Sequence, residues 1–94
     1  MKKRPVYASI WDALEASPGE AANLKVRAEL MRKIAAAIEA MAMTQAVAAA
    51  RCGISQPRIN DLLNGKVSRF SIDALVNIAA SLGRPVQVKL ARAS

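Results

Sequence analysis

The chain has 94 residues, enough for one domain, and carries a net charge of +7 with one cysteine and no histidine. A missing histidine removes the commonest general base and the ordinary zinc site, and one cysteine excludes an internal disulfide. Without a phosphate-cradling glycine loop or a clustered carboxylate pair, we expect no enzyme, no metal and no cofactor. No apolar run reaches membrane-spanning length and no signal core is present, so we expect a soluble cytoplasmic protein with no membrane contact.

Residues 1–17 are expected to form an N-terminal arm. Its first seven residues are basic and interrupted by Pro5, and a short helix can begin at the potential cap Ser9. Tyr7 and Trp11 are two of the three aromatic residues of the chain, and both residue types are enriched in interface hot spots. The arm is therefore a candidate partner-binding segment, although packing of Trp11 on the protein's own long helix is an equally good interpretation.

A long helix is predicted to begin after Ser17 and to run to about residue 41. Pro18 suits the first helical position, and Glu20 suits the third, where its carboxylate can reach back to the cap. Apolar residues recur at steps of four and three, which predicts one buried stripe. The stripe consists of Leu24, Ala28, Met31, Ala35, Ile38 and Ala42.

The segment 44–66, TQAVAAARCGISQPRINDLLNGK, predicts two short helices at about 44–52 and 55–63, joined by a tight turn. Thr44 and Ser55 can cap them, and Gly53 can take a left-handed conformation at the turn. Asn64 and Gly65 end the second helix. Ile59, Leu62 and Leu63 fall at helical spacing and are expected to face inward. This pattern indicates a helix-turn-helix, and hence double-stranded DNA as a ligand.

The positive charge lies where such a ligand would need it. Residues 44–94 carry seven basic groups and only Asp61 and Asp73 as acids, whereas residues 1–20 carry three of each sign. A basic surface of this kind attracts a polyanion.

A basic loop at 66–69 precedes a helix that Ser71 can cap and that Gly83 and Pro85 end. Residues 86–90 then alternate apolar and polar side chains, which predicts a short β-strand with Val86, Val88 and Leu90 on one face. A lone strand must pair with something. The candidates are the same strand of a second copy, the segment 5–10, or a partner protein. We favour a second copy, because a twofold homodimer also suits an operator with two half-sites ~34 Å apart.

The second motif helix is expected to lie in the major groove of DNA. Gln56 can pair with adenine, Arg58 with guanine, and Pro57 can contact a thymine methyl group. Asp61 can accept from the cytosine amino group or orient Arg58, and Asn60 can reach a base or a phosphate. The predicted base-reading residues are Gln56, Pro57, Arg58, Asn60 and Asp61.

The segment TQAVAAARCGISQPRINDLLNGK resembles the DNA-binding core of the XRE family of phage-repressor-like helix-turn-helix proteins. The flanking segments SIWDALEASPGEAANLKVRAELM and RFSIDALVNIAASLGRPVQVKL resemble small HigA-type antitoxins. The resemblance implies an all-α, five-helix lambda-repressor-like fold with one short C-terminal β-strand, in which residues 18–94 form the helix-turn-helix DNA-binding domain.

The resemblance also implies contacts to DNA. Positions matching Gln56, Pro57 and Asp61 touch bases in this family, and those matching Gln45 and Asn64 grip the backbone. Ser55, Lys66 and Arg69 are well placed to add phosphate contacts. The predicted phosphate-binding residues are Thr44, Gln45, Ser55, Asn64, Lys66 and Arg69.

A HigA-type protein represses its own operon and neutralises a small, basic, RelE-like ribonuclease toxin. The resemblance would place toxin binding in the N-terminal arm, at Val6, Tyr7, Ile10, Trp11 and Leu14.

Two other readings stay open. One is a stand-alone XRE-family regulator without a toxin, and the other is a protein-interaction module that no longer binds DNA. An acidic recognition face would signal the latter, but the face carries Gln56 and Arg58. A small-molecule effector is not expected, because no extra domain is left to hold one.

Overall fold

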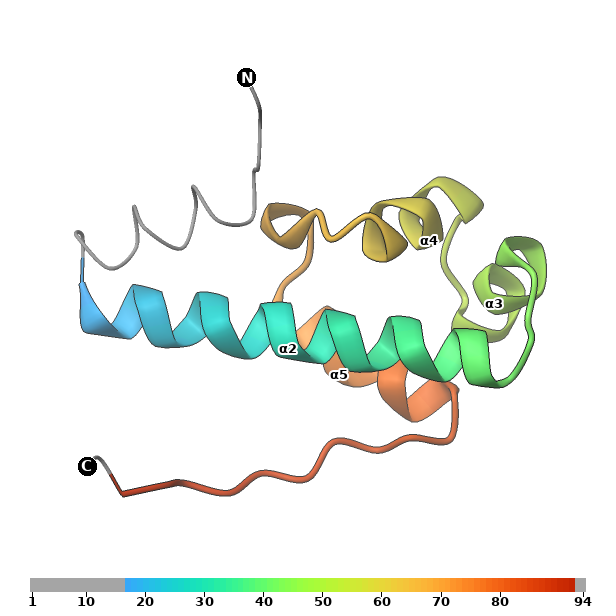
Figure 1. The fold of residues 1–94 in the computed structure, drawn as a ribbon. Helices are drawn as coiled ribbons and strands as arrows, with labels where there is room; N and C mark the ends of the chain where they lie inside the picture. The colour runs from blue at the N-terminus through green and yellow to red at the C-terminus, as the bar shows by residue number, and fades with distance from the viewer. Residues whose placement is uncertain (1–16, 93–94) are drawn as a thin grey trace.

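The computed structural model describes residues 17–92, which form α2 (Pro18–Ala40), α3 (Gln45–Cys52), α4 (Gln56–Leu63), the 3₁₀ turn η1 (Val67–Arg69) and α5 (Ile72–Ser81). The long helix α2 crosses the molecule, with α4 and η1 on one side and α5 on the other (Figure 1). In this part of the chain no single helix is long and apolar enough to cross a bilayer; only α2 and α3 together, bent by 118°, reach that length and composition.

The prediction of five helices and a C-terminal strand is wrong for the part of the chain that the structure describes. That part holds four α-helices and no strand. Residues 86–90 run on from α5 without a ladder partner, and alternation of side chains cannot make a strand where no neighbouring backbone supplies donors and acceptors. The expected short helix after Ser9 lies outside the described residues, as does the rest of the arm.

Hydroxyl side chains set the start of every α-helix in residues 17–92. Ser17, Thr44, Ser55 and Ser71 each accept a hydrogen bond from the backbone N–H three positions further on, at 3.0–3.2 Å. All four predicted caps are confirmed. A cap of this kind stabilises its helix by ~1 kcal/mol.

The buried face of α2 is wider than its predicted stripe. Leu24, Met31 and Ile38 are buried as predicted, and Ala28 and Ala35 are half-buried. Three further residues, Ala21, Ile34 and Ala37, are buried although they lie off the stripe. The face is wide because α4 and α5 both pack on α2, so the helix needs apolar side chains toward two neighbours.

Ala42 was predicted to be buried and is exposed instead. Helix α2 ends at Ala40, and the chain turns away through Ala42 with a left-handed φ of 55°. The backbone N–H groups of Ala42 and Met43 donate to the carbonyl oxygens of Glu39 and Ile38 at 3.0 and 3.2 Å. These bonds satisfy the last carbonyls of α2 and direct the chain into α3.

The centre of the core lies where α4, η1 and α5 meet on α2. Its largest fully buried side chains are Phe70, Ile59, Leu62, Leu75 and Leu82. Two of them belong to α4, which is therefore held firmly by its apolar side while the opposite side faces outward.

Candidate nucleic-acid interface

Helices α3 and α4 and the turn between them form the predicted helix-turn-helix. Gly53 ends α3 with φ 69° and ψ 29°, which is the left-handed conformation expected at this turn. The N–H of Ile54 donates back to the carbonyl oxygen of Ala49 at 3.1 Å, which closes the turn. Ala48 is fully buried, so its small side chain lets the two helices approach closely.

The outward face of α4 carries uncharged polar side chains. Gln56, Pro57, Asn60 and Asn64 are exposed, whereas Ile59 and Leu62 on the opposite side are buried. At about 100° per residue the four exposed positions fall within one face of the helix. This face is the part of α4 that can enter a groove of DNA.

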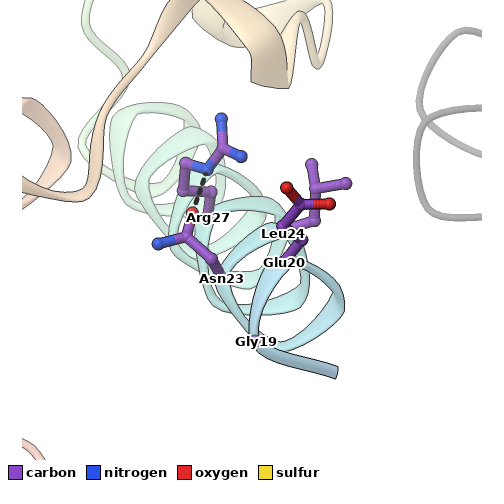
Figure 2. A pocket seen from close by; sticks show the side chains of 5 residues that line it. All are labelled: Gly19, Glu20, Asn23, Leu24 and Arg27. Atoms are coloured by element: carbon purple, nitrogen blue, oxygen red, sulfur yellow. Dashed lines mark hydrogen bonds between the residues drawn. The ribbon is translucent and has the colours of Figure 1, made fainter. Parts of the chain in front are cut away.

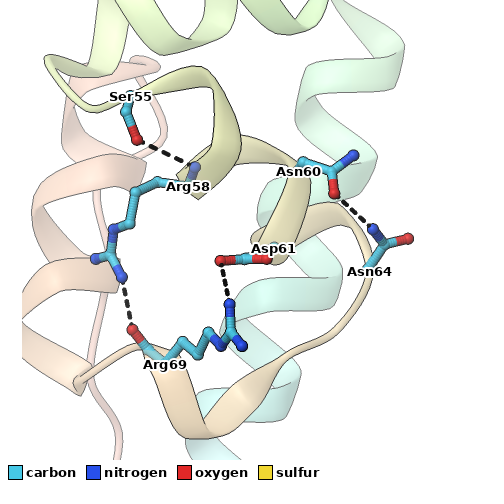
Figure 3. Close-up of polar contacts among 6 residues, drawn as sticks. All are labelled: Ser55, Arg58, Asn60, Asp61, Asn64 and Arg69. Atoms are coloured by element: carbon cyan, nitrogen blue, oxygen red, sulfur yellow. Dashed lines mark hydrogen bonds and ion pairs between the residues drawn. The ribbon is translucent and has the colours of Figure 1, made fainter.

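Arg58 and Asp61 flank this face and are half-buried rather than pointing freely outward (Figure 3). Arg58 Nη1 donates to the carbonyl oxygen of Arg69 at 2.7 Å, and its Cζ lies 4.2 Å from the centre of the Phe70 ring. Asp61 Oδ2 accepts from Arg69 Nη1 at 3.0 Å. Asp61 therefore pairs with Arg69, not with Arg58 as one of the sequence alternatives had it.

Asn60 and Asn64 lie one turn apart and contact each other. Asn64 Nδ2 donates to Asn60 Oδ1 at 3.0 Å (Figure 3). The Asn60 oxygen keeps a second lone pair, and its amide group keeps its donors. The pair thus holds both amides at the exposed face with hydrogen-bonding capacity to spare.

The predicted phosphate-binding residues lie around α4. Thr44 and Gln45 are at the start of α3, and Ser55 and Asn64 are at the two ends of α4. Lys66 and Arg69 follow α4, where Lys66 precedes η1 and Arg69 ends it. All six are exposed except Gln45, which is half-buried. The hydroxyl groups of Thr44 and Ser55 accept from the backbone as caps, and they retain an O–H donor for a phosphate oxygen.

Two other sets of predicted site residues do not form a described site. The toxin-binding candidates Val6, Tyr7, Ile10, Trp11 and Leu14 lie outside residues 17–92. Among the candidates for a dimer strand, Val86 is half-buried against the protein's own core. The side chains of Val88 and Leu90 are 84% and 93% exposed.

The sequence reasoning missed Arg27, which connects α2 to the turn after α4. Its Nη1 donates to the carbonyl oxygens of Val67 and Phe70 at 3.0 and 3.3 Å, and its Nε donates to Asn23 Oδ1 at 2.7 Å. Arg27 also lines a hollow near the start of α2 (Figure 2). No sequence signal separates Arg27 from the other basic residues of α2.

Cys52 is half-buried at the end of α3, as a small apolar side chain would be. Burial raises the pKa of its thiol, and the neighbouring Arg51 lowers it by less. The thiol stays protonated at neutral pH and is a poor nucleophile. Within residues 17–92 no three His, Cys, Asp or Glu side chains lie close enough to hold a metal ion.

Comparison with known proteins agrees with this geometry. The model of a family described as a helix-turn-helix domain matches residues 13–91, which is most of the chain. No curated protein and no solved structure matches the sequence. The match spans α2 to α5, including the complete α3–turn–α4 unit. The chain therefore belongs to this family of helix-turn-helix domains and is a DNA-binding protein.

Proposed function

We propose that this protein is a cytoplasmic, sequence-specific transcriptional repressor that binds double-stranded DNA through α4. The observation that carries the proposal is the exposed, uncharged face of α4 with Gln56 and Asn60. Side-chain amides can donate and accept together, and they pair bidentately with the major-groove edge of adenine. Pro57, on the same face, offers an apolar contact to a thymine methyl group.

Phosphate contacts would fix this face in the groove. The candidates come from segments before and after α4 as well as from its two ends: Thr44, Gln45, Ser55, Asn64, Lys66 and Arg69. Contacts of this type set affinity and orientation, while base contacts set sequence preference.

We propose that the protein binds its operator as a homodimer with two half-sites ~34 Å apart. The support is the apolar surface at Val88 and Leu90, whose side chains are exposed in the part of the chain that the structure describes. Valine and leucine side chains each gain about 1.5–3 kcal/mol from full burial, which a second copy could provide. Sedimentation of the wild type and of Leu90→Asp tests this, and a wild-type monomer at micromolar concentration would contradict it.

The experiment for DNA binding is selection from a library of randomised duplexes, followed by affinity measurements on the selected duplex and a scrambled duplex of equal length. We expect one enriched half-site, present twice, and a preference over the scrambled duplex of at least about 10³-fold. Equal affinity for both duplexes would contradict a sequence-specific repressor.

We further propose that the repressor is an XRE-type, HigA-like antitoxin that regulates its own operon and neutralises a RelE-like toxin. The support is the resemblance of the segments flanking the motif, together with Tyr7 and Trp11 in the N-terminal arm. The test is growth of bacteria that express an adjacent small reading frame alone or together with this chain. Arrest that co-expression relieves would support the antitoxin role. Absence of arrest, or arrest without relief, would instead favour a stand-alone regulator.

A further inference from the structure

We infer that Arg58 is a positioning residue that holds η1 against α4 and reads no base. The inference rests on the proposed DNA-binding function and assigns Arg58 a different part in it from the guanine contact that the sequence suggests. This role follows from the position of the Arg58 guanidinium and from the contacts within the protein that it would lose by turning toward DNA.

Two arginine side chains connect α4 and η1 in opposite directions. The Arg58 side chain, from the first turn of α4, donates to the backbone carbonyl of Arg69 at 2.7 Å. The Arg69 side chain, from η1, reaches back to Asp61 in the last turn of α4 at 3.0 Å. Each end of α4 is thereby tied to the same residue of η1 (Figure 3).

The Arg58 guanidinium is held by more than one interaction. It stacks 4.2 Å from the centre of the Phe70 ring, which is itself 1% exposed and cannot follow the guanidinium outward. Leaving this position for a guanine would give up a charge-assisted hydrogen bond and a cation–π contact together. A hydrogen bond to guanine would have to compensate for the loss of both interactions before it favoured guanine over another base.

Arginine side chains from both α2 and α4 contact the backbone of η1 and of Phe70, which follows it. Arg27 of α2 donates to the carbonyl oxygens of Val67 and Phe70, and Arg58 of α4 donates to that of Arg69. The carbonyl oxygens of Val67, Arg69 and Phe70 are thus held by guanidinium groups from two different helices.

Fixing η1 determines where Lys66 and Arg69 stand relative to the reading face. Lys66 directly precedes η1, and its N–H donates to the carbonyl oxygen of Asp61 at 3.0 Å. A preorganised cation loses less conformational entropy when it meets a phosphate. Arg58 therefore strengthens binding to every sequence, while the uncharged face with Gln56 and Asn60 selects among sequences.

The test compares the wild type with Arg58→Met, Arg58→Lys and the matched reader variant Gln56→Ala. Methionine keeps an unbranched apolar stem but has no guanidinium, so it loses the charge, the hydrogen bond to Arg69 and the stacking on Phe70. Lysine keeps the charge but lacks the planar fork. For each protein we would measure the selected base profile, affinity against salt, and amide hydrogen exchange of residues 66–70 without DNA.

We expect Arg58→Met to weaken binding to the selected and the scrambled duplex by a similar factor of roughly ten, because Lys66 and Arg69 are then ordered only when the protein binds DNA. The selected base profile of Arg58→Met should match that of the wild type, whereas Gln56→Ala should lose the base preference at one position. Arg58→Lys should show a smaller salt slope although its charge is kept, because Lys66 and Arg69 are no longer held in place. A variant that only lowered fold stability would leave that slope unchanged well below its melting temperature.

Loss of a guanine preference at one position in Arg58→Met would overturn the inference. Unchanged amide exchange of residues 66–70 in that variant would also overturn it, because η1 would then not depend on Arg58. A flat profile from the wild-type protein would contradict the proposed sequence-specific function instead, and the exchange measurement would still decide the role of Arg58.

Discussion

Arg27 and Val67 lie forty positions apart in the sequence and are joined by a hydrogen bond of 3.0 Å from the Arg27 guanidinium to the Val67 carbonyl oxygen. The same guanidinium donates to the carbonyl oxygen of Phe70 at 3.3 Å. Both contacts are partly buried, and the turn η1 makes no other side-chain contact of this kind with α2 among the described residues. A single side chain, that of Arg27, therefore supplies the hydrogen bonds between α2 and the turn that follows α4.

Arg27→Ala is expected to destabilise the protein by about 1–3 kcal/mol, because two partly buried carbonyl groups lose their charged donor. Urea denaturation measures this change. The matched control is Arg32→Ala on the exposed side of α2, which should stay within about 0.5 kcal/mol of wild type. Similar losses in both variants would show that positive charge on α2, not the bond to η1, sets the stability.

Substitutions at two turn residues are expected to change the free energy of unfolding in opposite directions. Gly53 has a left-handed φ of 69°, and a Cβ there would meet no atom within 4 Å, so Gly53→Ala introduces backbone strain alone. We expect a loss of about 1–2 kcal/mol. Ala42 already bears such strain at φ 55°, so Ala42→Gly should be neutral or stabilising by up to about 1 kcal/mol.

Thermal or urea unfolding of both variants provides the measurement. A destabilisation of Ala42→Gly equal to that of Gly53→Ala would mean that conformational entropy of the unfolded chain outweighs backbone strain at Ala42, although strain dominates at Gly53.

Lys66→Ala is expected to weaken binding to all duplexes alike and to reduce the slope of log affinity against log salt by roughly one. The reason is that Lys66 is exposed beside η1 and can neutralise one phosphate. Lys33→Ala serves as control, since Lys33 pairs at 3.4 Å with Glu29 on the exposed surface of α2. An unchanged slope in Lys66→Ala, or an equal change in Lys33→Ala, would remove Lys66 from the phosphate contacts.

Local signals in the sequence were sufficient to predict the helix-turn-helix. The caps Ser17, Thr44, Ser55 and Ser71 act over three residues, and Gly53 acts on its own backbone, so no tertiary information is needed to recognise them. The elements that follow from such short-range chemistry lie within one residue of where the sequence places them.

The errors arise where the outcome depends on a distant neighbour. Alternation at residues 86–90 reports a local preference, but a strand needs a backbone partner, which the described chain does not supply. Helical spacing places Arg58 and Asp61 on the second motif helix, but it does not show which groups their side chains contact within the protein. Their actual partners, Phe70 and Arg69, come from a turn whose position over α4 is set by the packed core. Arg27 escaped notice for the same reason.

Cys52 is expected to react slowly with iodoacetamide at pH 8 in the folded protein and much faster in urea. Burial raises the pKa of its thiol, so less thiolate is present in the folded state. The raised pKa also makes the free energy of unfolding depend on pH. The unfolded thiol ionises at lower pH than the folded one, so stability is lost as the pH rises through and above the unfolded value.

Mass spectrometry of the alkylated protein gives both rates, and equal rates in the two states would contradict a protected thiol. In Cys52→Ser the alkaline loss of stability should be smaller than in wild type, because serine does not ionise in this range.

Gln56→Ala should lower affinity for the preferred duplex by about 1–3 kcal/mol and flatten the preference at one base pair of each half-site. Gln56 is exposed at the first position of α4, where it can reach a base edge once the helix enters the major groove. Gln87→Ala is the matched control, because it removes the same amide from an exposed position in the C-terminal segment. We expect Gln87→Ala to keep the full base profile. An equal loss on preferred and scrambled duplexes in Gln56→Ala would show that Gln56 contacts the DNA backbone, and base reading would then fall to Asn60, whose amide lies on the same face.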